Sequence, residues 1–483
     1  MEQKSYYIKL FLMLECALLL FAGIFYFSCG DALYVRQSDG NIAEFGATND
    51  TGEILKGETI EQTYTSQMDK VTAVGVMVSN YGQPLDGQLN IRFEDLTAGA
   101  VITEQSFRTA DLGVNQYVYL AVPEYTMLRR GSQLKIALTT DASSGSAPTA
   151  LYNVGYVFER DSVGTDAVLT IRGEEVPGTL CISVQGENYV WTGPNFSKLV
   201  CLAAACAALF YWLMAVRSIR GKTSYFFAIF GVLKKYGFLM QQLVARDFKT
   251  RYKRSVLGVF WSLLNPLLTM TVQYIVFSTL FKSDIDNYPV YLLTGLVVFN
   301  FFTEGVGQAL TSIVGNASLI TKVYLPKYVY PVTRVLSSGI NLLMSLIPLL
   351  FAAVITKEQF TRAYLMAPYF LICVMVFTVG FGMIMASAMT FFRDVQFLWG
   401  VLSMIWMYLT PLFYPVTIVQ QDMRRYFDMN PMFHYVKAMR MIVMEGITPR
   451  PAEFAVCTAW AFGMLLGGCL IFKKTQDKFV FYI

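Results

Sequence analysis

Long apolar runs constrain this chain more than any other feature of its sequence. A helix of about 20 apolar residues spans the hydrocarbon core of a bilayer, and eight runs approach or exceed that length. They lie at residues 8–28, 198–216, 256–281, 289–311, 331–355, 364–389, 397–415 and 454–472. Only 15% of the residues are charged, against roughly 25% in soluble domains. The sequence therefore predicts a polytopic α-helical membrane protein with about eight transmembrane helices.

The segment between the first two runs has a different pattern. Short stretches of alternating apolar and polar residues recur, with turn signals such as Asp86-Gly87 and Arg130-Gly131 between them. They lie at Val71–Val78, Leu89–Phe93, Tyr117–Val122, Leu134–Leu138, Leu151–Val157 and Val168–Ile171. Alternation with period two and frequent turns predict an inserted all-β sandwich domain. The strand order stays open.

Charge gives the expected orientation. Residues 31–197 carry 21 acidic and 10 basic side chains, whereas residues 198–483 carry 11 acidic and 26 basic ones. Bases flank the first two runs at Lys4, Lys9, Arg217, Arg220 and Lys222. Because basic residues accumulate on the cytoplasmic side, the sandwich is expected outside, between an uncleaved anchor and a second membrane helix.

Five domains follow from these patterns. They are an N-terminal anchor at 1–29, an extracytoplasmic β-sandwich at 30–195, a second membrane helix at 196–217, a cytoplasmic amphipathic region at 218–255, and a six-helix membrane domain at 256–483.

Residues 234–254 combine an apolar stripe with basic residues and predict a helix on the inner membrane surface. The alternative is an ordinary surface helix of a soluble domain. The residues expected at the membrane interface are Arg246, Phe248, Lys249, Arg251, Tyr252, Lys253 and Arg254.

Cysteine and histidine usage limits the possible chemistry. Cys29 and Cys181 flank the acidic segment and can pair if that segment is extracytoplasmic. His434 is the only histidine, and no CxxC spacing occurs. We therefore expect neither a catalytic site nor a metal site.

Several stretches resemble, in order, the ABC-2 type permeases that export polysaccharides, namely the O-antigen and teichoic acid exporter permeases. They are 246–268 (RDFKTRYKRSVLGVFWSLLNPLL), 316–331 (NASLITKVYLPKYVYP), 392–395 (FRDV), 411–415 (PLFYP), and Asn430-Pro431 with Tyr435. The resemblance covers about residues 232–483. It implies a membrane domain that works with an ATPase, whereas the portion at 1–216 departs from the usual permease of this family.

The chain has no phosphate-binding loop of its own. Gly221-Lys222-Thr223 imitates the end of such a loop, but Val216 stands where its first glycine belongs. ATP and Mg are therefore expected on a separate cytoplasmic ABC ATPase subunit, in two copies, beside a second copy of this chain. Residues 313–330 are the candidate docking segment, although they can equally be a plain connection between helices. The coupling residues are Asn316, Leu319, Ile320, Lys322, Val323, Tyr324, Pro326 and Lys327.

Sugars offer C–H faces that stack on aromatic rings, and the resemblance implies an aromatic-lined passage. The channel candidates are Phe260, Trp261, Tyr274, Phe277, Glu304, Phe397, Trp399, Trp406 and Tyr408. Aromatic residues also fill cores and interfacial belts. Glu304 lies inside a run, where a carboxylate is costly and usually faces a cavity or a partner. The equal alternative is a position close enough to the inner membrane surface to be solvated.

The best-supported function is export of a lipid-linked glycan across a bacterial cytoplasmic membrane. The expected partners are the ATPase, a second copy, the glycan and membrane lipids, and no nucleic acid. The alternative is an integral-membrane glycosyltransferase or ligase acting on a similar lipid, but no convincing catalytic carboxylate or metal site supports it. A receptor-like sensor would not need six further spans.

Overall fold

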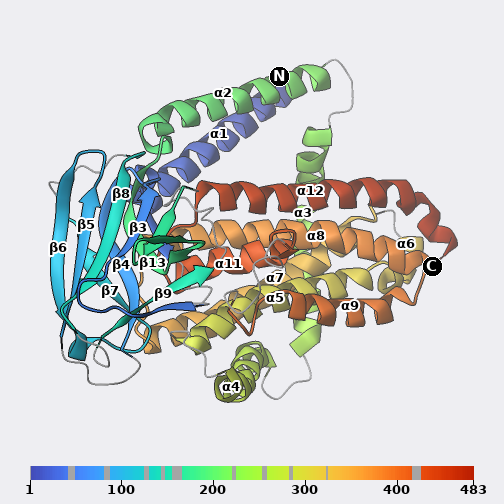
Figure 1. Cartoon of the computed structure of the whole chain (residues 1–483). Coiled ribbons are helices and arrows are strands. Elements are labelled where there is room, and N and C mark those ends of the chain that lie inside the picture. The colour runs from blue at the N-terminus through green and yellow to red at the C-terminus, as the bar shows by residue number, and fades with distance from the viewer. Residues whose placement is uncertain are drawn as a thin grey trace. The chain divides into compact units, whose positions relative to one another are not determined.

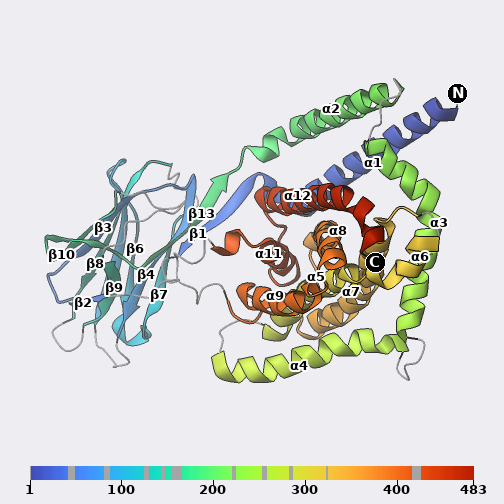
Figure 2. The same cartoon turned by 90° about the vertical axis from the view of Figure 1, so that its right-hand side faces the viewer.

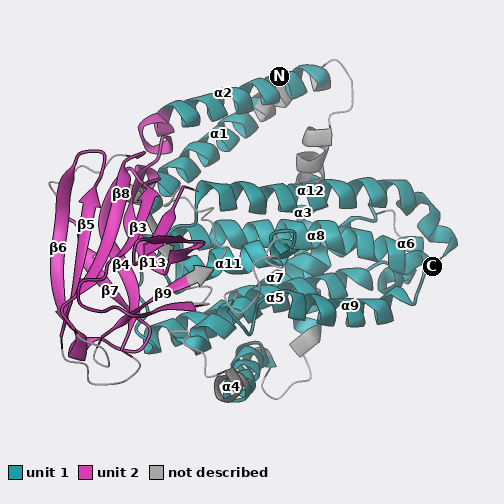
Figure 3. Ribbon diagram, viewed as in Figure 1, with its two compact units in different colours: residues 1–29, 198–483 teal, residues 30–197 magenta. Residues whose placement is uncertain are grey.

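The computed structural model describes residues 2–41, 49–80, 87–123, 130–142, 147–154, 166–219, 225–252, 258–281, 287–322, 325–415 and 426–482. The chain divides into two compact units (Figure 3). Residues 30–197 form one, hereafter the β unit. Residues 1–29 and 198–483 form the other, the helical unit.

Two antiparallel sheets make up the β unit (Figure 1). One has the order β1-β13-β4-β9-β12, with β2 paired to β9 and β7 to β4, and the other has the order β11-β10-β3-β8-β5-β6. The strands are β1 Val35–Asn41, β2 Asn49–Glu53, β3 Ile60–Thr65, β4 Lys70–Ser79, β5 Gln88–Asp95, β6 Ala100–Arg108, β7 Gln116–Ala121, β8 Gln133–Thr140, β9 Thr149–Val154, β10 Val168–Ile171, β11 Glu174–Val176, β12 Gly178–Leu180 and β13 Ile182–Tyr189.

Alternating apolar residues from both sheets form the core of the β unit. Val74 and Val76 of β4 are fully buried, as are Ile91 and Phe93 of β5. Since successive side chains of a strand point to opposite faces, this alternation brings the apolar set of each sheet inside. The predicted sandwich is confirmed.

The helical unit contains the expected long helices. Its helices are α1 Glu2–Cys29, α2 Thr192–Ile219, α3 Tyr225–Tyr252, α4 Trp261–Phe281, α5 Tyr288–Leu310, α6 Ala317–Lys322, α7 Val329–Ile355, α8 Ala367–Phe391, α9 Val395–Leu409, α11 Pro431–Val443 and α12 Pro451–Thr475. Among the described residues, six are long and apolar enough to cross a membrane, namely α1, α2, α5, α7, α8 and α12. Helices α4 and α9 overlap the two remaining predicted runs.

Helices α5, α7 and α8 pack together at the centre, and α3, α4, α9 and α12 surround them (Figure 2). In α5, 72% of the most apolar 18-residue stretch is buried, whereas in the corresponding stretches of α1 and α2 only 6% is buried. A soluble protein rarely exposes apolar surface on that scale, so the exposed helices are suited to lipid. The fold prediction of a helical membrane domain with an inserted all-β domain is confirmed.

A pair of glycines lets α8 and α12 approach closely. A Cβ atom on Gly468 would lie 2.2 Å from the carbonyl oxygen of Gly380, and a Cβ on Gly380 would lie 2.5 Å from backbone atoms of Met464 and Leu465. Small residues are the usual means by which membrane helices bring their backbones together.

Two expectations change in detail. The run at 397–415 predicts a full span, but α9 ends at Leu409 because Pro411 disfavours helical geometry in the residue before it; Thr410 is extended. Cys29 and Cys181, which the sequence allowed to pair, are both free thiols.

Candidate functional site

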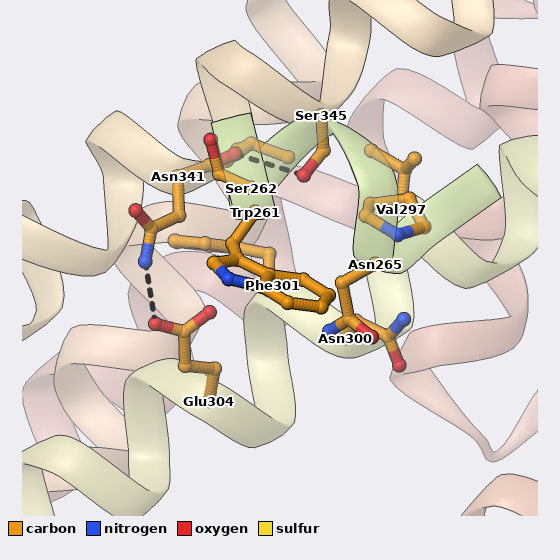
Figure 4. A pocket seen from close by; sticks show the side chains of 11 residues that line it. Trp261, Ser262, Asn265, Val297, Asn300, Phe301, Glu304, Asn341 and Ser345 are labelled. Atoms are coloured by element: carbon orange, nitrogen blue, oxygen red, sulfur yellow. Dashed lines mark hydrogen bonds between the residues drawn. The ribbon is translucent and has the colours of Figure 1, made fainter. Parts of the chain in front are cut away.

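A polar pocket of about 300 Å³ lies among α4, α5 and α7 (Figure 4). Its lining residues are Trp261, Ser262, Asn265 and Pro266 of α4, Val297, Asn300, Phe301 and Glu304 of α5, and Asn341, Leu342 and Ser345 of α7. Polar side chains are costly in a membrane domain and usually mark a substrate path or a partner. This concentration makes the pocket the candidate site.

Glu304 and Asn341 are held together inside the pocket. Nδ2 of Asn341 donates a hydrogen bond of 2.7 Å to Oε1 of Glu304, and Oγ of Ser345 donates one of 2.9 Å to the carbonyl oxygen of Asn341 (Figure 4). Asn341 is only 8% exposed, so packing fixes its amide. The carboxylate is consequently oriented from a rigid neighbouring helix.

The pocket offers binding groups for an uncharged, hydroxyl-rich molecule. Amides and hydroxyls both donate and accept hydrogen bonds, and Asn265, Asn300 and Ser262 supply such groups around the cavity. Trp261 is 47% exposed, and its indole suits the C–H face of a sugar. Glu304 is the only charged residue among those lining the pocket, so an anion is disfavoured there.

The same composition argues against glycoside chemistry in this pocket. Glycoside hydrolysis usually requires two carboxyl groups in defined roles, and Glu304 is the only carboxylate among the lining residues. Within the described residues, no group of three or more His, Cys, Asp and Glu side chains is arranged to hold a metal ion.

The other predicted channel residues are scattered. Phe260, Tyr274, Phe397 and Tyr408 are exposed, Trp399 is buried against Phe302 and Phe381, and Trp406 is partly buried against the same two rings. The side chain of Phe277 lies outside the described part of the chain. Of the nine candidates, the structure brings only Trp261 and Glu304 together in the pocket, and a channel role for the others stays a prediction.

Sequence reasoning missed most of the pocket because its polar groups come from three helices. Asn265, Asn300 and Asn341 are each isolated in an apolar run. Because a buried amide in such a run needs a hydrogen-bond partner, an asparagine inside a predicted membrane helix is the sequence signal that could have identified these residues.

The predicted coupling segment is anchored to the helical unit. Leu319 and Ile320 of α6 pack against a cluster that includes Tyr330 and Phe479. Asn316 is buried, and its Nδ2 donates to the carbonyl oxygen of Ser312 at 2.7 Å. Among the residues of α6 whose side chains are described, Ala317–Thr321, Ser318 and Thr321 are the exposed ones. The described surface of α6 is therefore polar.

The end of this segment is fixed as well. Nζ of Lys327 donates to the carbonyl oxygen of Gln476 at 2.6 Å, and Pro326 is half-buried. Val323 and Tyr324 lie outside the described residues, as does the side chain of Lys322. The coupling role of the segment stays a prediction.

Helix α3 covers most of the predicted interfacial segment. Met240 and Leu243 are buried against Val329 of α7, whereas Arg246 is 45% exposed. Phe248 is half-buried and Lys249 is exposed. The side chains of Arg251 and Tyr252, and the whole of Lys253 and Arg254, lie outside the described part.

A buried arginine of α11 joins the segment that follows α9 to α5. Nη1 of Arg440 donates to the carbonyl oxygen of Pro411 at 2.7 Å, and Nη2 donates to that of Leu412 at 3.0 Å. Its guanidinium carbon lies 3.4 Å from the ring centroid of Tyr291. Charge-assisted hydrogen bonds and the cation–π contact stabilise the buried charge, whereas Nε of Arg440 is buried with no hydrogen-bond partner among the described residues.

Asn430 caps α11 and joins it to α9. Its Oδ1 accepts from the backbone N–H of Met432 at 3.0 Å and from Nε1 of Trp406 at 2.8 Å. Pro431 occupies the first helical turn, where its missing N–H costs nothing. The Asn-Pro pair of the sequence is therefore a helix start and an interhelical contact.

Part of the chain is similar in sequence to known export permeases. Residues 239–444 match the family model described as ABC-2 type transporter. The O-antigen export system permease protein RfbA of Myxococcus xanthus is 28% identical over 249 residues, which are 51% of this chain and 96% of that protein. A protein of the same name from Klebsiella pneumoniae is 27% identical, covering 50% of this chain and 95% of its own length.

The polysialic acid transport protein KpsM of Escherichia coli is 24% identical, covering 49% of this chain and 93% of that protein. These alignments take in nearly all of each relative and about half of this chain. They confirm the resemblance read from the sequence. The β unit lies outside the family match.

Proposed function

We propose that this chain, which carries an ABC-2 type transporter domain at residues 239–444, is the membrane-spanning permease subunit of an exporter for a cell-surface polysaccharide. The observation that carries the proposal is the near-complete coverage of O-antigen export permeases by one half of the chain. The protein resides in the bacterial inner membrane, and its own role is transport rather than catalysis.

The substrate we propose is a lipid-linked glycan whose sugars pass the α4–α5–α7 pocket. Amide and hydroxyl groups around Glu304 suit sugar hydroxyls, and Trp261 suits a sugar face. Because Glu304 disfavours anions, the pocket supports a neutral or basic sugar over a polyanion.

The energy source in this proposal is a separate ABC ATPase in two copies, which binds ATP and Mg and acts on two copies of this chain. The exposed polar surface of α6, with Ser318 and Thr321, supports a docking contact there. Closure of the ATPase would then move α6 together with the packed cluster beneath it.

We further propose that the β unit is extracytoplasmic and contacts the emerging glycan. The support is the distribution of basic residues around the first two membrane helices. Export of teichoic acid is less favoured than export of a neutral glycan, because residues 31–197 are net acidic.

The test is outward transport of a lipid-linked glycan by the chain and its ATPase reconstituted in proteoliposomes. Trp261→Ala and Glu304→Ala are each expected to lower the transport rate at least about tenfold, the equivalent of about 1.4 kcal/mol in the transport barrier. Trp212→Ala is the matched control, because Trp212 is 60% exposed on α2 and does not line the pocket.

Docking is tested with Ser318→Trp, which adds bulk at an exposed position without removing internal packing. Loss of ATPase stimulation is expected, while Gln359→Trp, at an exposed position beyond α7, retains it. Sugar transfer by the isolated chain, or ATP-driven export without a partner ATPase, would contradict the proposal.

A further inference from the structure

A second cavity, of about 510 Å³, lies among α3, α7, the end of α5 and the start of α6. Unlike the first pocket, it is lined by two arginines, Arg246 of α3 and Arg334 of α7. Gln308 and Ser337 add amide and hydroxyl groups to its wall. The cavity therefore offers several hydrogen-bond donors beside a cationic pair.

One carboxylate holds both arginines in place. Oδ1 of Asp247 accepts from Nη2 of Arg246 at 2.9 Å and from Nε at 3.1 Å, while Oδ2 lies 3.2 Å from Nη1 of Arg334. The side chain of Asp247 is only 9% exposed. Shared contacts of this kind restrict the rotamers of long side chains before any ligand binds, which lowers the entropic cost of binding.

The charges of this triad do not balance. Two guanidinium groups face one carboxylate, which leaves one net positive charge at the cavity. The Arg334 side chain is 27% exposed and that of Arg246 is 45% exposed, so both are open to a ligand.

Guanidinium forks match the geometry of phosphate oxygens, and bidentate contacts to phosphate are among the strongest charge-assisted hydrogen bonds. The apolar side of α3 packs on α7 through Met240 and Leu243, and its basic sequence suits the level of lipid headgroups. A phosphate carried on a membrane lipid has both the charge and the location that this cavity requires.

We propose that the cavity between Arg246 and Arg334 binds the phosphate of a membrane lipid, and that in export it receives the phosphate or diphosphate joining the glycan to its lipid. This inference rests on the proposed function. It separates the substrate into two parts, with the sugar at the Glu304 pocket and the anionic linker at the arginine pair.

The experiment measures binding of a polyprenyl diphosphate and of phosphatidylglycerol to the full-length chain in a phosphate-free detergent solution. Arg246→Gln and Arg334→Gln are each expected to weaken binding of the diphosphate at least about tenfold. Lys474→Gln removes one positive charge from an exposed position on α12 away from the cavity and is expected to change affinity less than about twofold.

Arg246 is the safer of the two variants, because it is the more exposed and its removal leaves Arg334 paired with Asp247. Preferential, arginine-dependent binding of the diphosphate supports the linker as ligand. Equal, arginine-dependent binding of phosphatidylglycerol supports a general lipid phosphate.

Wild-type affinity in a folded Arg246→Gln protein overturns the proposal. The proposed export function is judged separately, by transport in proteoliposomes. If the arginine variants export glycan at the wild-type rate, only the phosphate site is refuted. If lipid binding depends on the arginines but no export occurs, only the transport proposal is refuted.

Discussion

The crossing of α8 and α12 gives the sharpest test of the packing. Replacing Gly468 with alanine adds one methyl group, whose carbon would lie 2.2 Å from the carbonyl oxygen of Gly380 and 2.8 Å from its carbonyl carbon. Both neighbours are backbone atoms and cannot rotate away. The helices must therefore separate by ~1 Å or more before the contact reaches an ordinary van der Waals distance.

The magnitude follows from two opposing effects. Overpacking a well-packed interior costs about 1–3 kcal/mol, and a clash with backbone atoms belongs at the upper end. Replacing glycine by alanine within a helix returns about 1 kcal/mol in helix propensity. We expect Gly468→Ala to lower the free energy of unfolding by about 2 kcal/mol.

The assay is thermal unfolding of the purified chain in detergent, followed by intrinsic tryptophan fluorescence. Gly463→Ala and Gly467→Ala are matched controls on the same helix, because beyond the adjoining residues and backbone of α12 no described heavy atom lies within 4 Å of a Cβ built at either position. Both controls are expected to unfold at or slightly above the wild-type midpoint, and Gly468→Ala clearly below it. A shared midpoint for Gly467→Ala and Gly468→Ala would refute the reasoning.

Three further predictions use the same unfolding assay. Arg440→Lys keeps the charge but loses the forked contacts with buried carbonyl groups, so we expect a loss of roughly 2–4 kcal/mol and a lower unfolding midpoint. Asn430→Ala removes the cap of α11 and the acceptor for Trp406, at a cost of about 1–3 kcal/mol, whereas Asn430→Asp is expected to recover most of it because its carboxylate still accepts. Burial lowers the pKa of His434, but its hydrogen bonds to Glu453 and to a backbone carbonyl outweigh that effect and raise the pKa above 6.5. The stabilisation by the protonated ring is therefore full below pH 6.5 and is lost as pH rises through the folded pKa. The difference in unfolding midpoint between the wild type and His434→Gln is expected to shrink with rising pH, and a constant difference would contradict this reasoning.

The sequence predicted the elements that have a recognisable local residue pattern. Long apolar runs gave the membrane helices, and alternation gave β4, β5, β7, β8, β9 and β10. It did not reveal β2, whose residues Asn49–Glu53 are polar, or β12, which has three residues. Such strands exist because β9 pairs with them on its two sides, and pairing partners distant in sequence leave no local pattern.

Some residues of the candidate site were predictable from the sequence and others were not. Glu304 and Trp261 are conspicuous in apolar runs, and the sequence analysis named both as channel candidates. The positions of Asn341 and Ser345 become meaningful only when α7 is placed against α5. Leu319 and Ile320 of α6 were predicted to couple the chain to a partner, and the structure shows both partly buried against a cluster that includes Tyr330. Their coupling role stays a prediction, because a hydrophobic stripe does not by itself say which of two neighbours buries it.

The C-terminal end of α1 makes specific contacts within the helical unit. A membrane anchor needs only length and hydrophobicity, yet the last turns of α1 make specific contacts with the ends of other helices. The rings of Phe25 and Phe454 meet edge to face at 5.0 Å. Oγ of Ser28 donates to the carbonyl oxygen of Arg362 at 3.0 Å, and Oγ1 of Thr448 donates to that of Ser28 at 3.0 Å. Because Ser28 lies in the last turn of α1, these contacts fix that end of the helix to the segments that precede α8 and α12.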